Sequence, residues 1–218
     1  MAARGEGFSA CNQTLLPAVA RLQNDHILQD IAVKSLDDPD PQVVGSAAAY
    51  LGVFGSAATE NLLWARFTTW SERWKGHESE LEYDPKHPNG GYEANAGLNL
   101  MQALATGHGW LTDEAKLRRL VDLSVGKQQK QQAQSYLSTW RARPWTINVI
   151  PFEPVQIEIG PYHEGSLESA KEKLAQFPRG TTFQLSDSGV REQQQTTLEE
   201  LSRYASEHGL RVVPAHNQ

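Results

Sequence analysis

The sequence Leu-Asp-Asp-Pro-Asp-Pro-Gln-Val-Val-Gly-Ser-Ala-Ala-Ala-Tyr-Leu, residues 36–51, decides the fold. An apolar helical pattern ends there, an acidic Asp-Pro-Asp-Pro turn follows, and a second helix begins at once with small residues at helical spacing. Two helices joined by so short a turn form an antiparallel hairpin. Small side chains allow neighbouring hairpins to pack closely, so the stretch predicts a stack of helical hairpins.

Helical patterns continue on both sides of this stretch. Apolar residues recur at helical spacing over 15–35, before the turn. Glycines and prolines exclude a continuous helix over 75–91. Paired in order, the segments make about three hairpins, so this part of the chain is predicted to be mainly α. The further helix-compatible segments lie at about 41–53, 57–74, 92–106, 112–124 and 127–141.

The stretch from Leu36 to Gly55 resembles the inter-helix signature of HEAT repeats, the unit of one class of α-solenoid. The resemblance covers about residues 25–143 and implies a short HEAT-like solenoid over 15–147, after a polar tail at 1–14. Solenoids of this kind mostly bind other proteins. HEAT hairpins usually carry an arginine directly after the first valine of the second helix, where this chain has Val44. The arginine–aspartate ladder of the family is therefore not implied here.

The hydrophobic period changes from 3.6 to 2 beyond the helical segments. Residues 155–159 alternate between apolar and polar, which is typical of a half-buried strand. A helix that begins after Ser166, a strand at 181–185, a helix ended by Gly209 and a strand at 210–213 follow. We expect a small βαβαβ domain over 148–218, with three parallel strands and two helices. Its first strand also resembles that of peptidoglycan-binding SPOR domains, although the strand hairpin between the helices of that family is missing.

The charge and composition of the chain argue against several classes of partner. The net charge is −6 over 218 residues, and no part carries the basic excess that nucleic acid or an anionic membrane requires. The single cysteine, Cys11, excludes an intrachain disulfide and a cysteine zinc site. No apolar run is long enough to span a membrane, and no secretory signal is present. We therefore expect a cytoplasmic protein.

One predicted helix, at 57–74, carries an unusual set of aromatic and basic side chains. Two interpretations are open. Bulky aromatics at helical spacing fill the core between helical layers. Alternatively, tryptophan and arginine together form an exposed patch, which is the composition of interaction hot spots. The residues in question are Trp64, Arg66, Phe67, Trp70, Arg73 and Trp74.

The segment from His77 to His87 holds two imidazoles and four carboxylates, which are possible ligands for a divalent metal. HEAT-repeat hydroxylases, which the chain resembles in this respect, bind iron through His-Glu pairs, and His77-Glu78 is such a pair. Those enzymes repeat the pair on successive helices, whereas the only other one here is His163-Glu164. An acidic loop with proline and glycine is usually solvated, so we expect no metal and no cofactor.

Two loops follow predicted strands and are expected to meet at the carboxyl edge of the parallel sheet. They span 160–165 and 186–191, and they offer Tyr162, His163 and Arg191 for contact with a ligand or peptide. Their polar side chains also include types suited to nucleophilic catalysis. However, the sequence has no nucleophile elbow, no phosphate-binding glycine loop and no dinucleotide fingerprint. We assign no catalytic residue.

These observations favour a non-enzymatic scaffold or adaptor that binds another protein through the solenoid surface. Two alternatives remain: a HEAT-like enzyme of the metal-dependent hydroxylase or lyase type, and a ligand-binding α/β module that the solenoid supports. If the aromatic patch is exposed, replacing Trp70 and Arg73 by alanine weakens partner binding without unfolding the chain. The predicted binding residues are Trp64, Arg66, Trp70, Arg73, Trp74, Tyr162, His163 and Arg191.

Overall fold

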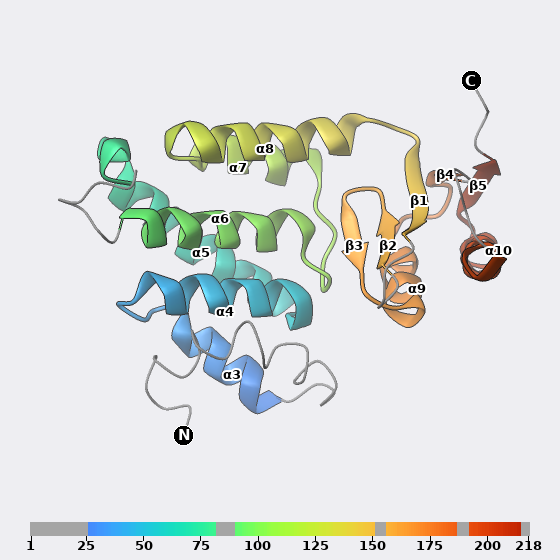
Figure 1. Ribbon diagram of the computed structural model, residues 1–218, viewed down its shortest axis with the longest axis horizontal. Coiled ribbons are helices and arrows are strands. Elements are labelled where there is room, and N and C mark those ends of the chain that lie inside the picture. The colour runs from blue at the N-terminus through green and yellow to red at the C-terminus, as the bar shows by residue number, and fades with distance from the viewer. Residues whose placement is uncertain (1–25, 82–89, 151–155, 187–191, 215–218) are drawn as a thin grey trace. The chain divides into compact units, whose positions relative to one another are not determined.

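The computed structural model describes residues 26–81, 90–150, 156–186 and 192–214. The chain forms two compact units, which divide within a helix after Ser135. The predicted tail at 1–14 and the predicted helical residues 15–25 lie outside the described residues. The described part of the first unit is helical (Figure 1), with elements α3 (His26–Ser35), α4 (Pro41–Phe54), α5 (Ala57–Trp74), η1 (Glu78–Leu81), α6 (Gly90–Thr106), α7 (Glu114–Leu123) and the start of α8 (Gly126–Arg141).

The acidic turn that the sequence predicts joins α3 to α4. Asp40 caps α4, because its carboxylate accepts a hydrogen bond from the backbone N–H of Gln42 at 2.8 Å, and Pro41 takes the first helical position. The carboxylate of Asp38 in turn accepts from the backbone N–H of Asp40 at 2.8 Å. Local hydrogen bonds therefore fix the turn, and α3 packs against α4.

Small residues bring α4 and α6 into close contact, and the two helices lie side by side (Figure 1). A Cβ atom on Gly52 would lie 3.1 Å from the Cα of Ala103, and one on Gly45 would lie 3.3 Å from the Cα of Ala96. The two glycines lie seven residues apart on α4, and the two alanines lie seven residues apart on α6, so the two contacts repeat along the same faces of the helices. The glycines that the sequence places at helical spacing thus permit this approach.

Gly97 on α6 provides a test of this packing. A Cβ there would lie 2.6 Å from the ring of Trp70 and would collide with the side-chain amide of Gln129. We expect Gly97→Ala to lower the free energy of unfolding by up to about 2 kcal/mol, because the overpacking costs about 1–3 kcal/mol and the gain in helix propensity offsets only about 1 kcal/mol of it. Urea unfolding measures this change. Gly91→Ala on the same helix is the matched control, since nothing lies within 4 Å of its Cβ, and its stability should stay equal or rise.

The described part of the second unit is an α/β structure. Its five-stranded sheet has the order β3-β2-β1-β4-β5, in which β1, β4 and β5 are parallel while β2 is antiparallel to both β1 and β3. Helices α9 and α10 pack against each other and against strands of the sheet. The elements are β1 (Trp145–Ile150), β2 (Gln156–Ile159), β3 (Tyr162–Glu164), α9 (Leu167–Ala175), β4 (Thr182–Leu185), α10 (Glu192–Glu207) and β5 (Arg211–Pro214).

The prediction of three parallel strands is therefore wrong. The first parallel strand is β1, a segment that the sequence reading assigned to the end of the last helix and a linker. The predicted first strand is β2, which runs antiparallel to β1. The alternation that marks β1 is present, since Trp145, Ile147 and Val149 are buried. Prolines at 144 and 151 lie directly before and after this segment, and prolines so close together are typical of a linker.

Candidate functional site

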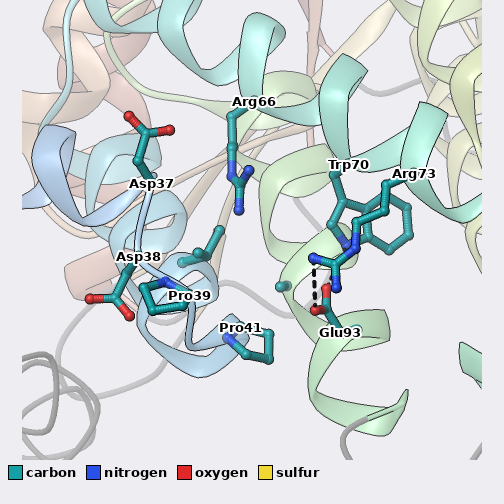
Figure 2. Close-up of a pocket in the computed structure, with 10 residues that line it drawn as sticks. Asp37, Asp38, Pro39, Pro41, Arg66, Trp70, Arg73 and Glu93 are labelled. Carbon is teal, nitrogen blue, oxygen red and sulfur yellow. Dashed lines mark hydrogen bonds and ion pairs between the residues drawn. The ribbon is translucent and has the colours of Figure 1, made fainter.

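A pocket of about 150 Å³ lies in the first unit (Figure 2). The turn between α3 and α4 and the first residues of α4 form one side of it, and side chains of α5 and α6 form the rest. The lining is mixed, with charged groups, two prolines and the edge of an indole ring. The labelled residues in Figure 2 are Asp37, Asp38, Pro39, Pro41, Arg66, Trp70, Arg73 and Glu93.

Glu93 is the fixed anion of the pocket. It is only 9 % exposed, and its Oε2 accepts hydrogen bonds from the indole N–H groups of Trp70 and Trp74, each at 3.2 Å. Its Oε1 lies 3.4 Å from Nη1 of Arg73. Hydrogen bonds to a carboxylate are stronger than those between neutral groups, so three side chains of α5 are held by one residue of α6.

Arg66 differs from the other charged groups of the pocket. Its Nε is buried and has no hydrogen-bond partner within the part of the chain that the structure describes. Figure 2 shows its guanidinium pointing into the space between the turn and Trp70, while the carboxylates of Asp37 and Asp38 point away from it. A buried donor without an acceptor costs about 1–3 kcal/mol. The unpaired Nε of Arg66 is therefore the group of this pocket that is best suited to bind a ligand.

The tryptophans belong mainly to the core, which is the first of the two interpretations made from the sequence. Trp64 is 6 % exposed, Phe67 is 0 % exposed and Trp70 is 2 % exposed. Only Trp74, at the end of α5, is half-buried. The expectation that Trp70 can be removed without unfolding is therefore withdrawn, because its ring fills space beside Gly97.

Trp64 lies apart from the pocket. Its indole N–H donates to Oε1 of Glu60 at 3.2 Å, and the same oxygen lies 2.6 Å from Nζ of Lys116 on α7. The guanidinium of Arg119 lies 4.4 Å from the centre of its ring. Trp64 thus holds α5 against α7, whereas Arg66, Trp70 and Arg73 line the pocket.

The residues that complete the pocket could not be predicted from the sequence. The turn at 37–41 predicts only a helix hairpin, and nothing near Glu93 in the sequence indicates a role in a site. The pairing of Glu93 with Trp70 spans 23 residues, so no local spacing reveals it. An acidic residue near the start of a helix is ordinarily explained by the helix dipole alone.

The structure describes only part of the predicted loop site in the second unit. Tyr162 is fully buried, with its ring centre 6.0 Å from that of Phe177. His163 is exposed, and its Nδ1 lies 3.5 Å from Oε1 of Glu158. Because β2 is antiparallel to β1 and β4 is parallel to it, the chain leaves β2 and β4 in opposite directions. Arg191 lies outside the described residues.

The second unit also buries a lysine. Lys173 on α9 is 0 % exposed, and its Nζ lies 4.3 Å from the ring centre of Tyr162. Burial lowers the pKa of Lys173 to about 8, while the nearby carboxylate of Glu164 acts in the opposite direction. Glu164 is itself only 4 % exposed. Both groups therefore belong to the core of the second unit.

The predicted metal segment is only partly described. His77 and Glu80 form a pair, with 2.9 Å between Nδ1 and Oε1, and residues 82–87 of the segment lie outside the described residues. Elsewhere in the described chain, no group of three or more metal-ligating side chains is close enough to hold an ion. No helix among the described residues is long and apolar enough to cross a membrane.

Comparison with models of protein families, with curated proteins and with solved structures finds no match. The HEAT resemblance therefore remains a prediction from the sequence. The pocket beside the turn has to be interpreted from its own geometry and chemistry.

Proposed function

We propose that the helical unit recognises another protein by taking one side chain of that partner into the pocket beside the α3–α4 turn. The observation that carries this proposal is the size of the pocket, about 150 Å³. A cavity of that volume holds a group about as large as benzene. Sites for small-molecule substrates and cofactors usually measure about 300–1,000 Å³. The pocket therefore suits one anchoring side chain better than a substrate.

The surroundings of the pocket support a protein partner. The side chain of Arg73 is 63 % exposed, and its guanidinium lies 5.1 Å from the ring centre of the half-buried Trp74. Tryptophan and arginine are the residues most enriched in interaction hot spots. Both are already bound to Glu93, so little conformational freedom would be lost on binding. A pre-organised edge of this kind favours recognition.

The helix packing is consistent with the HEAT-like architecture that the sequence suggested. Helices α3 and α4 pack together, as do α5 and α6, and the second helix of each pair contacts the other. A stack of hairpins presents turns along one edge, where a partner chain can reach several of them. We therefore include a HEAT-like solenoid in the proposal.

Site-specific photo-crosslinking tests the proposed function. A photoreactive amino acid replaces the exposed Asp37 beside the pocket, or the exposed Asp122 on α7 as the matched control. After irradiation in the native host, we expect position 37 to yield one reproducible protein adduct that position 122 does not yield. Mass spectrometry identifies the adduct. No adduct at position 37, or the same adduct at both positions, would show that the pocket is not the binding site.

A further inference from the structure

We infer that the group taken into the pocket is the carboxylate of an aspartate or glutamate side chain of the partner, bound by the guanidinium of Arg66. This inference rests on the proposed function and adds the chemistry of its ligand. It follows from the unpaired donor edge of Arg66, from the charges around the pocket and from the volume that is free.

The donor edge of Arg66 matches a carboxylate in geometry. Nε–H and one Nη–H of a guanidinium point in parallel along one edge, and the two oxygens of a carboxylate accept both. Nε of Arg66 is buried, and no described residue accepts from it. The guanidinium of Arg73 is already paired, because its Nη1 lies 3.4 Å from Oε1 of Glu93. Arg66 is thus the cation that a ligand can neutralise among the described residues of the pocket.

The charges of the pocket favour a carboxylate over a phosphate. No described residue accepts from Nε of Arg66, and Glu93, one of the anions that line the pocket, is buried and held by its own donors. A carboxylate brings a single negative charge to this site. A phosphate group carries about −1.5 to −2 charges, more than the single guanidinium of Arg66 can neutralise. The carboxylates of Asp37 and Asp38, which also line the pocket, point away from Arg66 (Figure 2).

The free volume favours a side chain over the end of a chain. A side-chain carboxylate needs room only for itself and its methylene stem, which Pro39, Pro41 and the indole of Trp70 can contact. A C-terminal carboxylate would bring the last peptide group and the last side chain with it. A pocket of about 150 Å³ does not hold all three. The ligand is therefore an internal acidic residue.

Titration of the full chain with small probes tests this inference. The probe is N-acetyl-L-glutamate α-amide, and N-acetyl-L-glutamine α-amide is its uncharged match. We expect the glutamate probe to shift the Arg66 Nε–H NMR signal in a saturable way, and the glutamine probe to leave it in place. Arg66→Met and Arg66→Lys should weaken the glutamate probe at least about ten-fold, read from other pocket signals, because both lose the fork. Arg118→Met, which removes an exposed arginine paired with Glu114, should have no effect.

Further arms separate the alternatives. Acetyl-glycyl-glycine with a free C-terminus should bind at least about ten-fold more weakly than the glutamate probe, and inorganic phosphate should not shift the signal. Equal shifts with the glutamate and glutamine probes, or tighter binding of the free C-terminus or phosphate, would overturn the inference.

If Arg66→Met retains the adduct from position 37, protein recognition stands and the carboxylate is refuted. The absence of that adduct in the wild type refutes the proposed function itself. Urea unfolding checks that Arg66→Met is folded, and we expect no loss of stability because its buried Nε has no acceptor to lose.

Discussion

Trp70→Ala is expected to lower the free energy of unfolding of the helical unit by about 3–5 kcal/mol. The indole is 2 % exposed, its ring is stacked on Phe67 with 6.2 Å between ring centres, and its N–H donates to Glu93. Truncation therefore leaves a cavity beside Gly97 and removes one of the donors that hold a buried carboxylate. Urea unfolding followed through the methyl NMR signals of the buried Leu100 and Leu104 measures the loss.

Trp74→Ala is the matched control for Trp70→Ala. Its indole N–H donates to the same oxygen of Glu93 at the same distance, 3.2 Å, but its ring is only half-buried. We expect a smaller loss of stability, below about 2 kcal/mol, because folding removes less of the apolar surface of the Trp74 ring from water. Equal losses in the two variants would mean that the hydrogen bond to Glu93, and not burial of the ring, dominates.

The free energy of unfolding of the C-terminal unit is expected to rise between pH 8 and pH 10.5 by about 3 kcal/mol through Lys173. Burial lowers the pKa of Lys173 from 10.5 in the unfolded chain to about 8 in the folded one. Within this interval the unfolded chain binds more protons than the folded chain, so stability increases with pH. Below pH 8 both states hold the proton, and the gain is absent.

The difference between the wild type and Lys173→Met isolates this effect from other groups that titrate in alkali. Urea unfolding at a series of pH values, followed through the methyl signals of the buried Ile147 and Ile157, gives both curves. Lys171→Met on the same helix should keep the rise, because Lys171 is partly exposed and pairs with Glu200 at 2.5 Å. Parallel curves for the wild type and Lys173→Met would contradict the prediction.

The helices could be predicted from the sequence because their signals are local. Asp40, Asp113 and Ser166 cap α4, α7 and α9, each by accepting from a backbone N–H two or three residues on. Gly209, which ends α10, has a φ of +77° that favours glycine. Capping, helical spacing and glycine stops all act within a few residues. The observed bounds of α4, α5, α6 and α8 consequently lie within two residues of those predicted.

Strand β1 and the pocket could not be predicted, because they depend on contacts between distant residues. Val149 pairs with Ile157 on one side, and Ile147 pairs with Leu185 on the other, so the place of β1 in the sheet is set by segments on either side of a helix. The pocket likewise needs the turn, Arg66 and Glu93 together. Of the predicted binding residues, Arg66, Trp70 and Arg73 do line it. The aromatic and basic composition of α5 indicated them, but not which were buried.

The glycine contacts between α4 and α6 bear on the width of the pocket. Pro41 and Val44 line it from α4, while Glu93 and Ala96 line it from α6. Gly45 and Gly52 determine how near these helices come, although neither residue lines the pocket. One methyl group added at Gly52 would press on Ala103 and spread the helices. If the pocket binds a side chain as proposed, substitutions at Gly45 or Gly52 could change the size of side chain that fits, while the residues that line the pocket stay the same.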